Sequence, residues 1–460
     1  MRISLNEGPV WRVLLSLVLP MIAAVVAVLA VSLADTYFVG LLGTDALAAL
    51  SFTFPVTFSV SSLSIGLGAG ASSVVARVLG AKHEELARRY STDSLMLSLV
   101  LVVVVSVVGF FTIDPVFTAI GAEGEVLTLI GRYMRIWYVS MPFLVIPIVA
   151  SAIIRATGDA VFPSQLMITA AVANVVFTPL CVFGLGPVPA MGIEGAAVGT
   201  LMARAITLVA GLWVIVRREK LVTLEVPALA EGLRSWKEIA AVGLPAAGGN
   251  MVNPLAIGLV TGFLATFGAE TVAGFGVATR IEAFACIPML AMSSVIGPVC
   301  GQAWGAGLRD RVWEGLWASY LMCVGWTAVL SLAFAFLGES LVGVFSDDPQ
   351  VLAPAKAYLA IIGPSLFGYG VVIITAAAFN GIGRAQLGLG FYLVRAALFY
   401  VPLSWLAALY LGRREAFIAM AISNAVSGLL VGVLAFALLR RSTREPQLDP
   451  AHRPGRQRAT

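Results

Sequence analysis

Charged residues are scarce in this chain. Of its 460 residues, 12% are Asp, Glu, Lys or Arg, whereas 59% are hydrophobic. The mean hydropathy is +0.96. A soluble protein carries about a quarter charged residues, so the composition excludes an ordinary globular enzyme.

Histidine and cysteine are also few. The two histidines, His83 and His452, lie in a loop and in the C-terminal tail. They therefore offer no metal site to the apolar segments, where an intramembrane enzyme would hold its catalytic groups. The four cysteines lack metal or redox spacing, and we expect them to act as small apolar residues. We expect no enzymatic activity, no cofactor and no resident metal.

Long apolar runs account for most of the chain. Each is long enough to cross a hydrocarbon core of about 30 Å as a helix. The sequence therefore predicts an all-α polytopic membrane protein with twelve transmembrane helices. The predicted spans lie near residues 12–34, 47–69, 94–113, 132–154, 164–184, 193–216, 238–265, 271–298, 316–337, 355–378, 388–410 and 415–439.

The distribution of Lys and Arg predicts the orientation. These residues concentrate in the even-numbered loops and near both ends of the chain, whereas the odd-numbered loops lean acidic, with Arg413 and Arg414 as the exception. By the positive-inside rule both termini are cytoplasmic, and we expect the protein in the cell membrane. The N-terminus lacks the pattern of a cleavable signal. Because topology explains the basic loops, the net charge of +4 implies no nucleic-acid partner.

The two halves of the chain resemble each other at a constant displacement. LVLPMIAA with Pro20 matches VGLPAAGG with Pro245, and RVLGAKHEE with Gly80 matches QAWGAGLRD with Gly305 at the same separation. GIEGAAVGTLMAR (192–204) and GRREAFIAMAISN (412–424) match less well, at a slightly shorter one. A repeat of six spans keeps its membrane orientation, which predicts two pseudo-symmetric six-helix lobes and is typical of transporters. The predicted division is 1–216, a cytoplasmic linker 217–237, a second lobe 238–440 and a disordered tail 441–460.

Several motifs carry a resemblance to a known family. They are LADTYFVGLLGTDALAALSF, ARVLGAKHEE, RATGD, NVVFTPL, and VATRIEAF followed by CGQAWGAG. Over essentially its whole length the chain resembles the multidrug and toxic compound extrusion (MATE) family. The resemblance implies a twelve-helix antiporter that expels organic cations or related amphipathic compounds in exchange for protons or sodium. Lipid-linked oligosaccharide flippases and polysaccharide exporters of the same superfamily are the alternative.

An acid, Asp35, lies about three-quarters of the way along the first predicted span. Ionisable groups inside a membrane are costly and are functional candidates. A carboxylate in a cleft that opens alternately to water changes its proton affinity with conformation. The alternative is an aspartate that simply reaches interfacial water. In the family, the matching aspartate is the central coupling residue of the N-terminal lobe.

Three polar residues are placed beside Asp35 by the resemblance. Asn174 and Thr178 share a helical face in the fifth span, and Thr200 lies in the sixth. Where family members often carry a second aspartate, this chain has Thr178, which weakens a sodium site and favours protons; sodium at the Asp35 cluster stays the alternative. These residues could instead only join helices by hydrogen bonds. Tyr138 is a candidate for the same cavity, with aromatic packing as the alternative.

The second lobe has one deep acid, Glu282, in the eighth span. Arg280 points to a different face of the helix, so we expect the partner of Glu282 to be Arg395 of the eleventh span, in a structural ion pair or in coupling. Arg204 is a further intramembrane cation, and Asn253 occupies the span-seven position at which some family branches carry an acid. The missing acids favour a DinF-like mechanism that is coupled in the N-terminal lobe.

Two prolines lie at equivalent points of the repeat. Pro20 and Pro245 interrupt the helical hydrogen bonds and permit bending, so we expect hinges there. The expected partners are a small amphipathic or cationic substrate and the lipid bilayer, and we expect a monomer.

Overall fold

The computed structural model describes residues 4–184, 188–223, 229–345 and 348–442. Over these residues the chain forms helices joined by short connections. Eleven helices are long and apolar enough to cross a membrane, and α9 and α10, bent by 47° at their junction, together make a twelfth span. The structure therefore confirms the predicted all-α polytopic fold.

The first six spans are formed by seven α-helices, with α4 as a short extra helix and the π-helical η1 extending α7. They are α1 (Val10–Gly40), α2 (Thr44–Gly80), α3 (Glu84–Phe111), α4 (Ile113–Ala119), α5 (Gly124–Ala156), α6 (Val161–Phe183), α7 (Ile193–Trp213) and η1 (Val214–Arg218).

The second six spans contain more breaks. They are α8 (Leu229–Leu264), η2 (Ala265–Phe267), α9 (Ala269–Ala285), α10 (Ile287–Gly305), α11 (Arg309–Gly343), α12 (Pro349–Ile362), η3 (Gly363–Ser365), α13 (Leu366–Gly381), α14 (Ala385–Leu393), η4 (Val394–Tyr400), α15 (Val401–Tyr410) and α16 (Arg413–Ser442). Residues 229–237 of the predicted linker thus form the first turns of α8, and residues 443–460 of the predicted tail lie outside the described residues.

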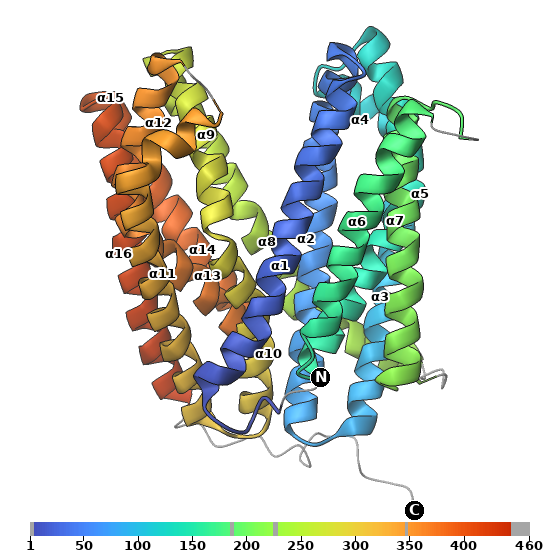
Figure 1. The fold of residues 1–460 in the computed structure, drawn as a ribbon. Coiled ribbons are helices and arrows are strands. Elements are labelled where there is room, and N and C mark those ends of the chain that lie inside the picture. Colours follow the sequence, from blue (N-terminus) through green and yellow to red (C-terminus); the bar gives the residue numbers. More distant parts are fainter. Residues whose placement is uncertain (1–3, 185–187, 224–228, 346–347, 443–460) are drawn as a thin grey trace, which may run out of the picture.

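The helices form two groups that diverge toward one side of the molecule (Figure 1). We call the side where α1 begins and α16 ends the termini face, and the opposite side the distal face. Near the termini face the groups are packed together, with α2 against α8, α10 and α13. At the distal end, large apolar side chains of both groups are exposed, among them Phe54 of α2 and Leu255 of α8. The lobes are therefore closed at the termini face and apart at the distal face.

Helix α1 crosses from one lobe to the other. Its first half, from Val10 to Met21, packs in the apolar core of the second lobe, whereas its later part lies against α6 of the first. Pro20 lies where the helix leaves the second lobe. Arg311 of α11 holds the segment before α1 by donating to the backbone carbonyls of Leu5 (2.8 Å), Glu7 (2.9 Å) and Gly8 (3.0 Å).

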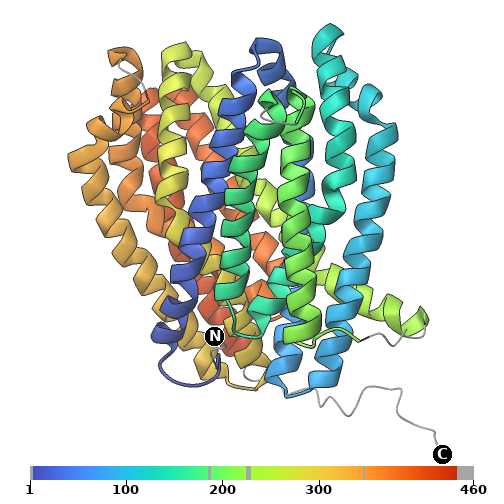
Figure 2. The same ribbon diagram turned by 45° about the vertical axis from the view of Figure 1, so that its right-hand side comes forward.

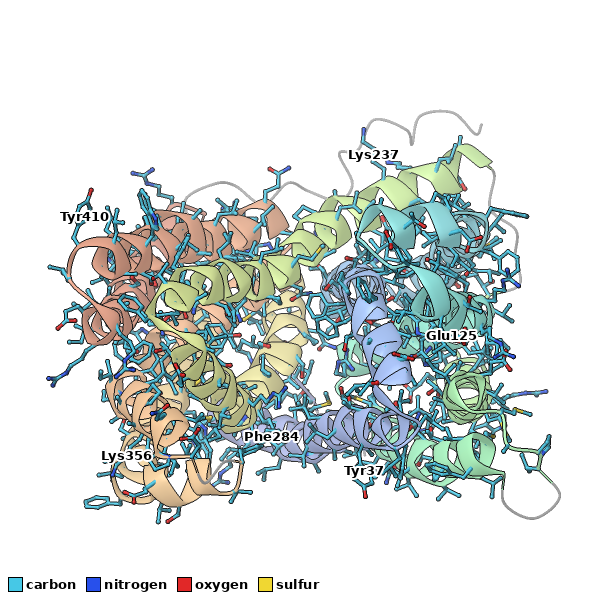
Figure 3. The ribbon with its side chains drawn as sticks, turned by 90° about the horizontal axis from the view of Figure 1, so that it is seen from above. Tyr37, Glu125, Lys237, Phe284, Lys356 and Tyr410 are labelled. Atoms are coloured by element: carbon cyan, nitrogen blue, oxygen red, sulfur yellow. The ribbon has the colours of Figure 1, made fainter. Side chains whose placement is uncertain are left out.

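Helix α8 makes the reciprocal crossing. Its first turns extend past the lower half of α3 of the first lobe (Figure 2). There Arg89 pairs with Glu231 at 2.8 Å, and the Tyr90 hydroxyl donates to Glu238 at 2.7 Å. Seen from above, α1 and α8 pass on opposite sides of the space between the lobes, with Lys237 on the α8 side and Tyr37 on the α1 side (Figure 3). Each lobe therefore holds the start of the other lobe's first helix.

Glycines bring the lobes into backbone contact at the termini face. A Cβ atom on Gly80 of α2 would overlap the carbonyl oxygen of Gln302 of α10, and a Cβ atom on Gly305 of α10 would overlap that of Arg77 of α2. Gly80 and Gly305 occupy equivalent positions of the repeat, and so do Arg77 and Gln302. The duplicated motifs thus meet each other across the seam.

Hydrogen bonds to backbone carbonyls accompany these contacts. Gln302 Nε2 donates to the carbonyl of Ala156 at 2.7 Å, and Ser73 Oγ donates to that of Gly381 at 3.0 Å. Ala156 and Gly381 are again equivalent in the repeat. Because each bond joins the two lobes, opening of the termini face must break both.

Candidate functional site

The structure brings Asp35 together with the polar residues expected beside it. Asp35 lies near the distal end of α1, and its carboxylate is beside the hydroxyl of Thr178 on α6. Its Oδ1 atom is buried and has no hydrogen-bond partner among the described residues. A buried carboxylate oxygen without a donor is energetically costly, so this atom is suited to receive a proton or a cation.

A chain of hydrogen bonds orders the residues behind Asp35. Thr178 Oγ1 donates to Asn174 Oδ1 at 3.3 Å, and Asn174 Nδ2 donates to Thr200 Oγ1 at 3.0 Å. Thr200 in turn donates to the carbonyl of Ala196 on its own helix, at 2.9 Å. A change at Asp35 can therefore alter the hydrogen bonds between α6 and α7.

Two further groups complete this cluster. Arg204 of α7 donates from Nη1 to Ser140 Oγ of α5 at 3.0 Å and attracts Asp35 electrostatically. Tyr133 of α5 lies near both Arg204 and Asp35. Neither Ser140 nor Tyr133 was identified from the sequence. The repeat offered a signal for Tyr133, because Tyr358 stands at the equivalent position of the second half.

Tyr138 is directed elsewhere. It is buried, its ring packs edge-on to that of Trp137, and a Cβ atom on Gly109 of α3 would overlap it. This placement corresponds to aromatic packing between α3 and α5.

In the second lobe Glu282 and Arg395 have separate partners. Glu282 of α9 accepts a hydrogen bond of 2.6 Å from the Tyr358 hydroxyl of α12. Arg395 attracts Glu282 through space, but the two side chains form no ion pair. Of the two expected arrangements, the structural ion pair is therefore not formed, because the carboxylate accepts from Tyr358 and the guanidinium donates to two amides from Nη1 and Nε; a role in coupling stays a prediction.

Those amides belong to Asn253 of α8 and Asn424 of α16. Arg395 donates from Nη1 to Asn253 Oδ1 and from Nε to Asn424 Oδ1, both at 2.9 Å. Asn424 was missed, although it ends the motif that pairs with the motif ending at Arg204. Arg280 lies on the same helix as Glu282, with an exposed side chain.

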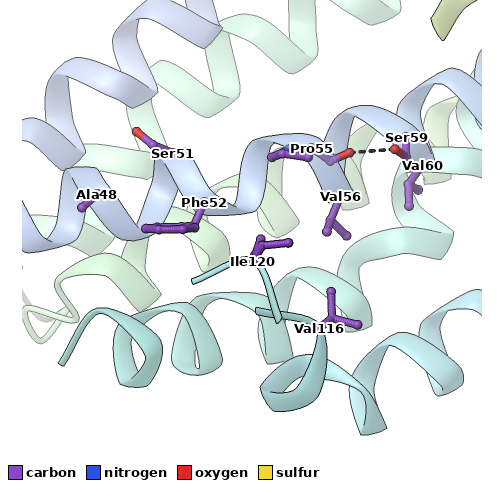
Figure 4. Close-up of a pocket in the computed structure, with 9 residues that line it drawn as sticks. All are labelled: Ala48, Ser51, Phe52, Pro55, Val56, Ser59, Val60, Val116 and Ile120. Atoms are coloured by element: carbon purple, nitrogen blue, oxygen red, sulfur yellow. Dashed lines mark hydrogen bonds between the residues drawn. The ribbon is translucent and has the colours of Figure 1, made fainter. Parts of the chain in front are cut away.

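An open apolar cavity of about 760 Å³ lies between α2 and α4 (Figure 4), and no residue of either polar cluster lines it. It is formed by the distal half of α2, including Phe52 and Pro55, and by Val116 and Ile120 of α4 and the turn after it. None of the residues predicted from the sequence lines it. The signal for it is the alternation of apolar residues and serines in α2, such as Ser59, which donates to the Pro55 carbonyl at 2.7 Å.

Comparisons with known proteins agree with this architecture. The sequence profile of the MatE family matches residues 20–180 and 245–406, which covers most of both lobes. A relative from Shewanella oneidensis described as an FAD transporter is 35% identical over 441 residues, covering 96% of each chain. The probable multidrug resistance protein YoeA of Bacillus subtilis is 26% identical over 388 residues, 82% of each chain.

A solved structure has the same fold. It is a MOP superfamily transporter from Pyrococcus furiosus, described by the reverse polarity of its binding pocket, with a TM-score of 0.87 and 26% identity over 96% of this chain and 98% of the other. The profile matches both lobes, and the Shewanella relative spans nearly the whole chain. This protein is therefore a transporter rather than an enzyme, and it belongs to the multidrug and toxic compound extrusion family.

Proposed function

We propose that this chain is a secondary active exporter that exchanges protons, bound at Asp35, for an amphipathic substrate by alternating access. The observation that carries the proposal is the buried, unbonded Oδ1 atom of Asp35 in an ordered polar cluster near the distal face. Protonation removes the negative charge of this carboxylate and so lowers the cost of keeping its oxygen buried without a donor. The cell membrane with both termini in the cytoplasm is the proposed setting, so the distal face is extracellular.

In the proposed cycle, the lobes are first apart at the distal face. Protonation of Asp35 changes its contact with Thr178 and the packing of α1 against α6, and it promotes release of the substrate. Because the first half of α1 is packed in the second lobe, a movement of α1 at Pro20 is transmitted to that lobe. The termini face then opens, the proton leaves to the cytoplasm and new substrate enters.

For the substrate, we propose a planar anionic compound of the FAD type. The relative described as an FAD transporter supports this assignment. Arg204 and Arg395 are the arginines that the sequence places deep in the spans and that are not exposed in the structure, and Asp35 and Glu282 are the corresponding acids. Protonation of Asp35 gives this set of groups a positive excess. Such a charge balance attracts an anion and repels a cation.

Organic cations are the second candidate, as the family resemblance implies. The Bacillus relative described as a multidrug resistance protein supports them. The apolar cavity beside α2 would suit the rings of either class. The intramembrane arginines are compatible with a lipid-linked oligosaccharide as substrate, but the twelve-span architecture argues against it.

Reconstituted protein in proteoliposomes tests these assignments. FAD and a fluorescent organic cation are loaded in parallel, and their exit is followed under an inward proton gradient, an inward sodium gradient and no gradient. We expect FAD to leave fastest with the proton gradient. Exit of the cation alone would reassign the substrate, and stimulation by sodium alone would replace the proton as the coupling ion.

A further inference from the structure

The second lobe holds a buried guanidinium that forms no ion pair with a carboxylate of the described residues. Arg395 is 4% exposed. It takes part in none of the ion pairs of the described residues. Glu282, the acid that it attracts, is bonded to Tyr358 instead. A charge inside a membrane protein is costly unless a partner neutralises it. An anion that binds to Arg395 would therefore be stabilised.

The backbone around Arg395 is also unusual. Arg395 lies in η4, a π-helix from Val394 to Tyr400 inside the eleventh span. Such segments are rare and are frequent at functional sites. Residues five apart come close in a π-helix, so Arg395 and Tyr400 lie on one side of it. The guanidinium carbon is 4.8 Å from the ring centre of Tyr400 and 4.7 Å from that of Tyr369.

The guanidinium is oriented but not saturated. A guanidinium has five N–H donors, and the bonds to Asn253 and Asn424 use one each of Nη1 and Nε. Nη2 makes no hydrogen bond to a described residue. It is also not fully buried, so part of its surface remains accessible. Two amides thus fix the orientation of an arginine that contacts two aromatic rings, and they leave Nη2 free of described partners.

We propose that Arg395 is the centre of an anion-binding site in the second lobe, which takes the phosphoryl groups of the substrate. Guanidinium groups bind phosphate through their N–H donors, and Nη2 has two N–H groups that no described residue accepts. The rings of Tyr369 and Tyr400 hold the guanidinium in place by cation–π contact. The identity of the substrate rests on the proposed function, whereas the site itself requires only an anionic phosphoryl group.

Binding of three ligands to purified protein tests the site. FAD carries a pyrophosphate, riboflavin carries the same ring system without phosphate, and inorganic pyrophosphate carries the charge without the ring. We expect Arg395→Gln to weaken the binding of FAD and of pyrophosphate at least tenfold, whereas the affinity for riboflavin should change less than twofold. Arg395→Lys keeps the charge without the paired donors and should restore part of the affinity. Arg413→Gln, at an exposed arginine of the same lobe, is the matched control and should leave all three ligands unchanged.

The outcomes separate the site from the proposed substrate. The proposed anion site is contradicted if Arg395→Gln weakens the binding of riboflavin as much as that of FAD. It is also contradicted if the affinities for FAD and pyrophosphate stay unchanged. If the wild-type protein binds pyrophosphate through Arg395 but no flavin, the site stands and the FAD assignment fails. If it binds neither FAD nor pyrophosphate, both proposals fall.

Discussion

Gly80 and Gly305, at equivalent positions of the repeat, each lie against a backbone carbonyl of the opposite lobe. Neither position has room for a Cβ atom. The two carbonyls, of Gln302 and Arg77, are themselves equivalent. The seam at the termini face is therefore a self-complementary contact that arises from the duplication of one sequence, as in a symmetric dimer interface.

Replacement of a seam glycine should open the termini face. In Gly305→Ala the new methyl group overlaps the carbonyl of Arg77, and such overpacking costs about 1–3 kcal/mol. Cys300, buried one turn earlier in α10, is the reporter in a variant without the other cysteines. We expect its labelling by a membrane-permeant maleimide to become several-fold faster. Gly325→Ala, where nothing lies within 4 Å, should leave the rate unchanged; equal labelling in both variants would contradict the seam.

Removal of the acid in the first lobe should abolish coupling. Asp35→Asn keeps the shape of the side chain but cannot release a proton. We expect proton-driven FAD exit from proteoliposomes to fall at least tenfold, while binding of FAD persists. Asp45→Asn, at an exposed position in the first turn of α2, is the control. Full proton-driven transport by Asp35→Asn would sink the proposed role of this residue.

The hydrogen-bond chain behind Asp35 should contribute to both stability and transport. Thr200→Val has nearly the same shape but leaves the Asn174 amide without its acceptor, at a cost of about 1 kcal/mol. We expect a lower Tm in detergent and slower transport. Thr266→Val removes a hydroxyl whose bond is to the Phe263 carbonyl of its own segment, and it should change neither. A Tm equal to that of the wild type for Thr200→Val would argue against an ordered cluster.

The clamp on the start of α1 should matter for transmission between the lobes. Arg311→Ala removes three hydrogen bonds to backbone carbonyls, with a loss of about 2 kcal/mol. We expect lower stability and slower proton-driven exit, because the first half of α1 is then less firmly held by the second lobe. Arg414→Ala, at an exposed arginine, is the control for loss of charge. Unimpaired exit with Arg311→Ala would show that α1 transmits no movement by this route.

Local pattern sufficed for the spans and for part of the candidate site. The apolar runs fixed the helices because an unpaired backbone is too costly in lipid, and the repeat indicated two lobes. Asp35, Asn174 and Thr178 were identifiable because a polar group stands out in an apolar helix. Ser140 was not, since a serine in a membrane helix is unremarkable until its partner is known. Tyr133 and Tyr358 could have been found only from their equivalent positions in the repeat. The structural ion pair of Glu282 with Arg395, one of the two expected arrangements, is absent from the described residues because Tyr358 binds the carboxylate instead.

The sequence by itself determined that this chain crosses the membrane, that its halves are copies, and that the charge of Asp35 has no counterpart, because Val260 stands at the equivalent position. Only the tertiary structure decided that α1 and α8 begin in the opposite lobes and that Gly80 and Gly305 form a reciprocal seam. It also decided that Arg395 contacts two tyrosine rings and forms no ion pair with a carboxylate of the described residues. Hydropathy acts residue by residue and is readable along the chain. Close approach of backbones and the choice of a hydrogen-bond partner depend on how distant helices pack, which no local pattern records.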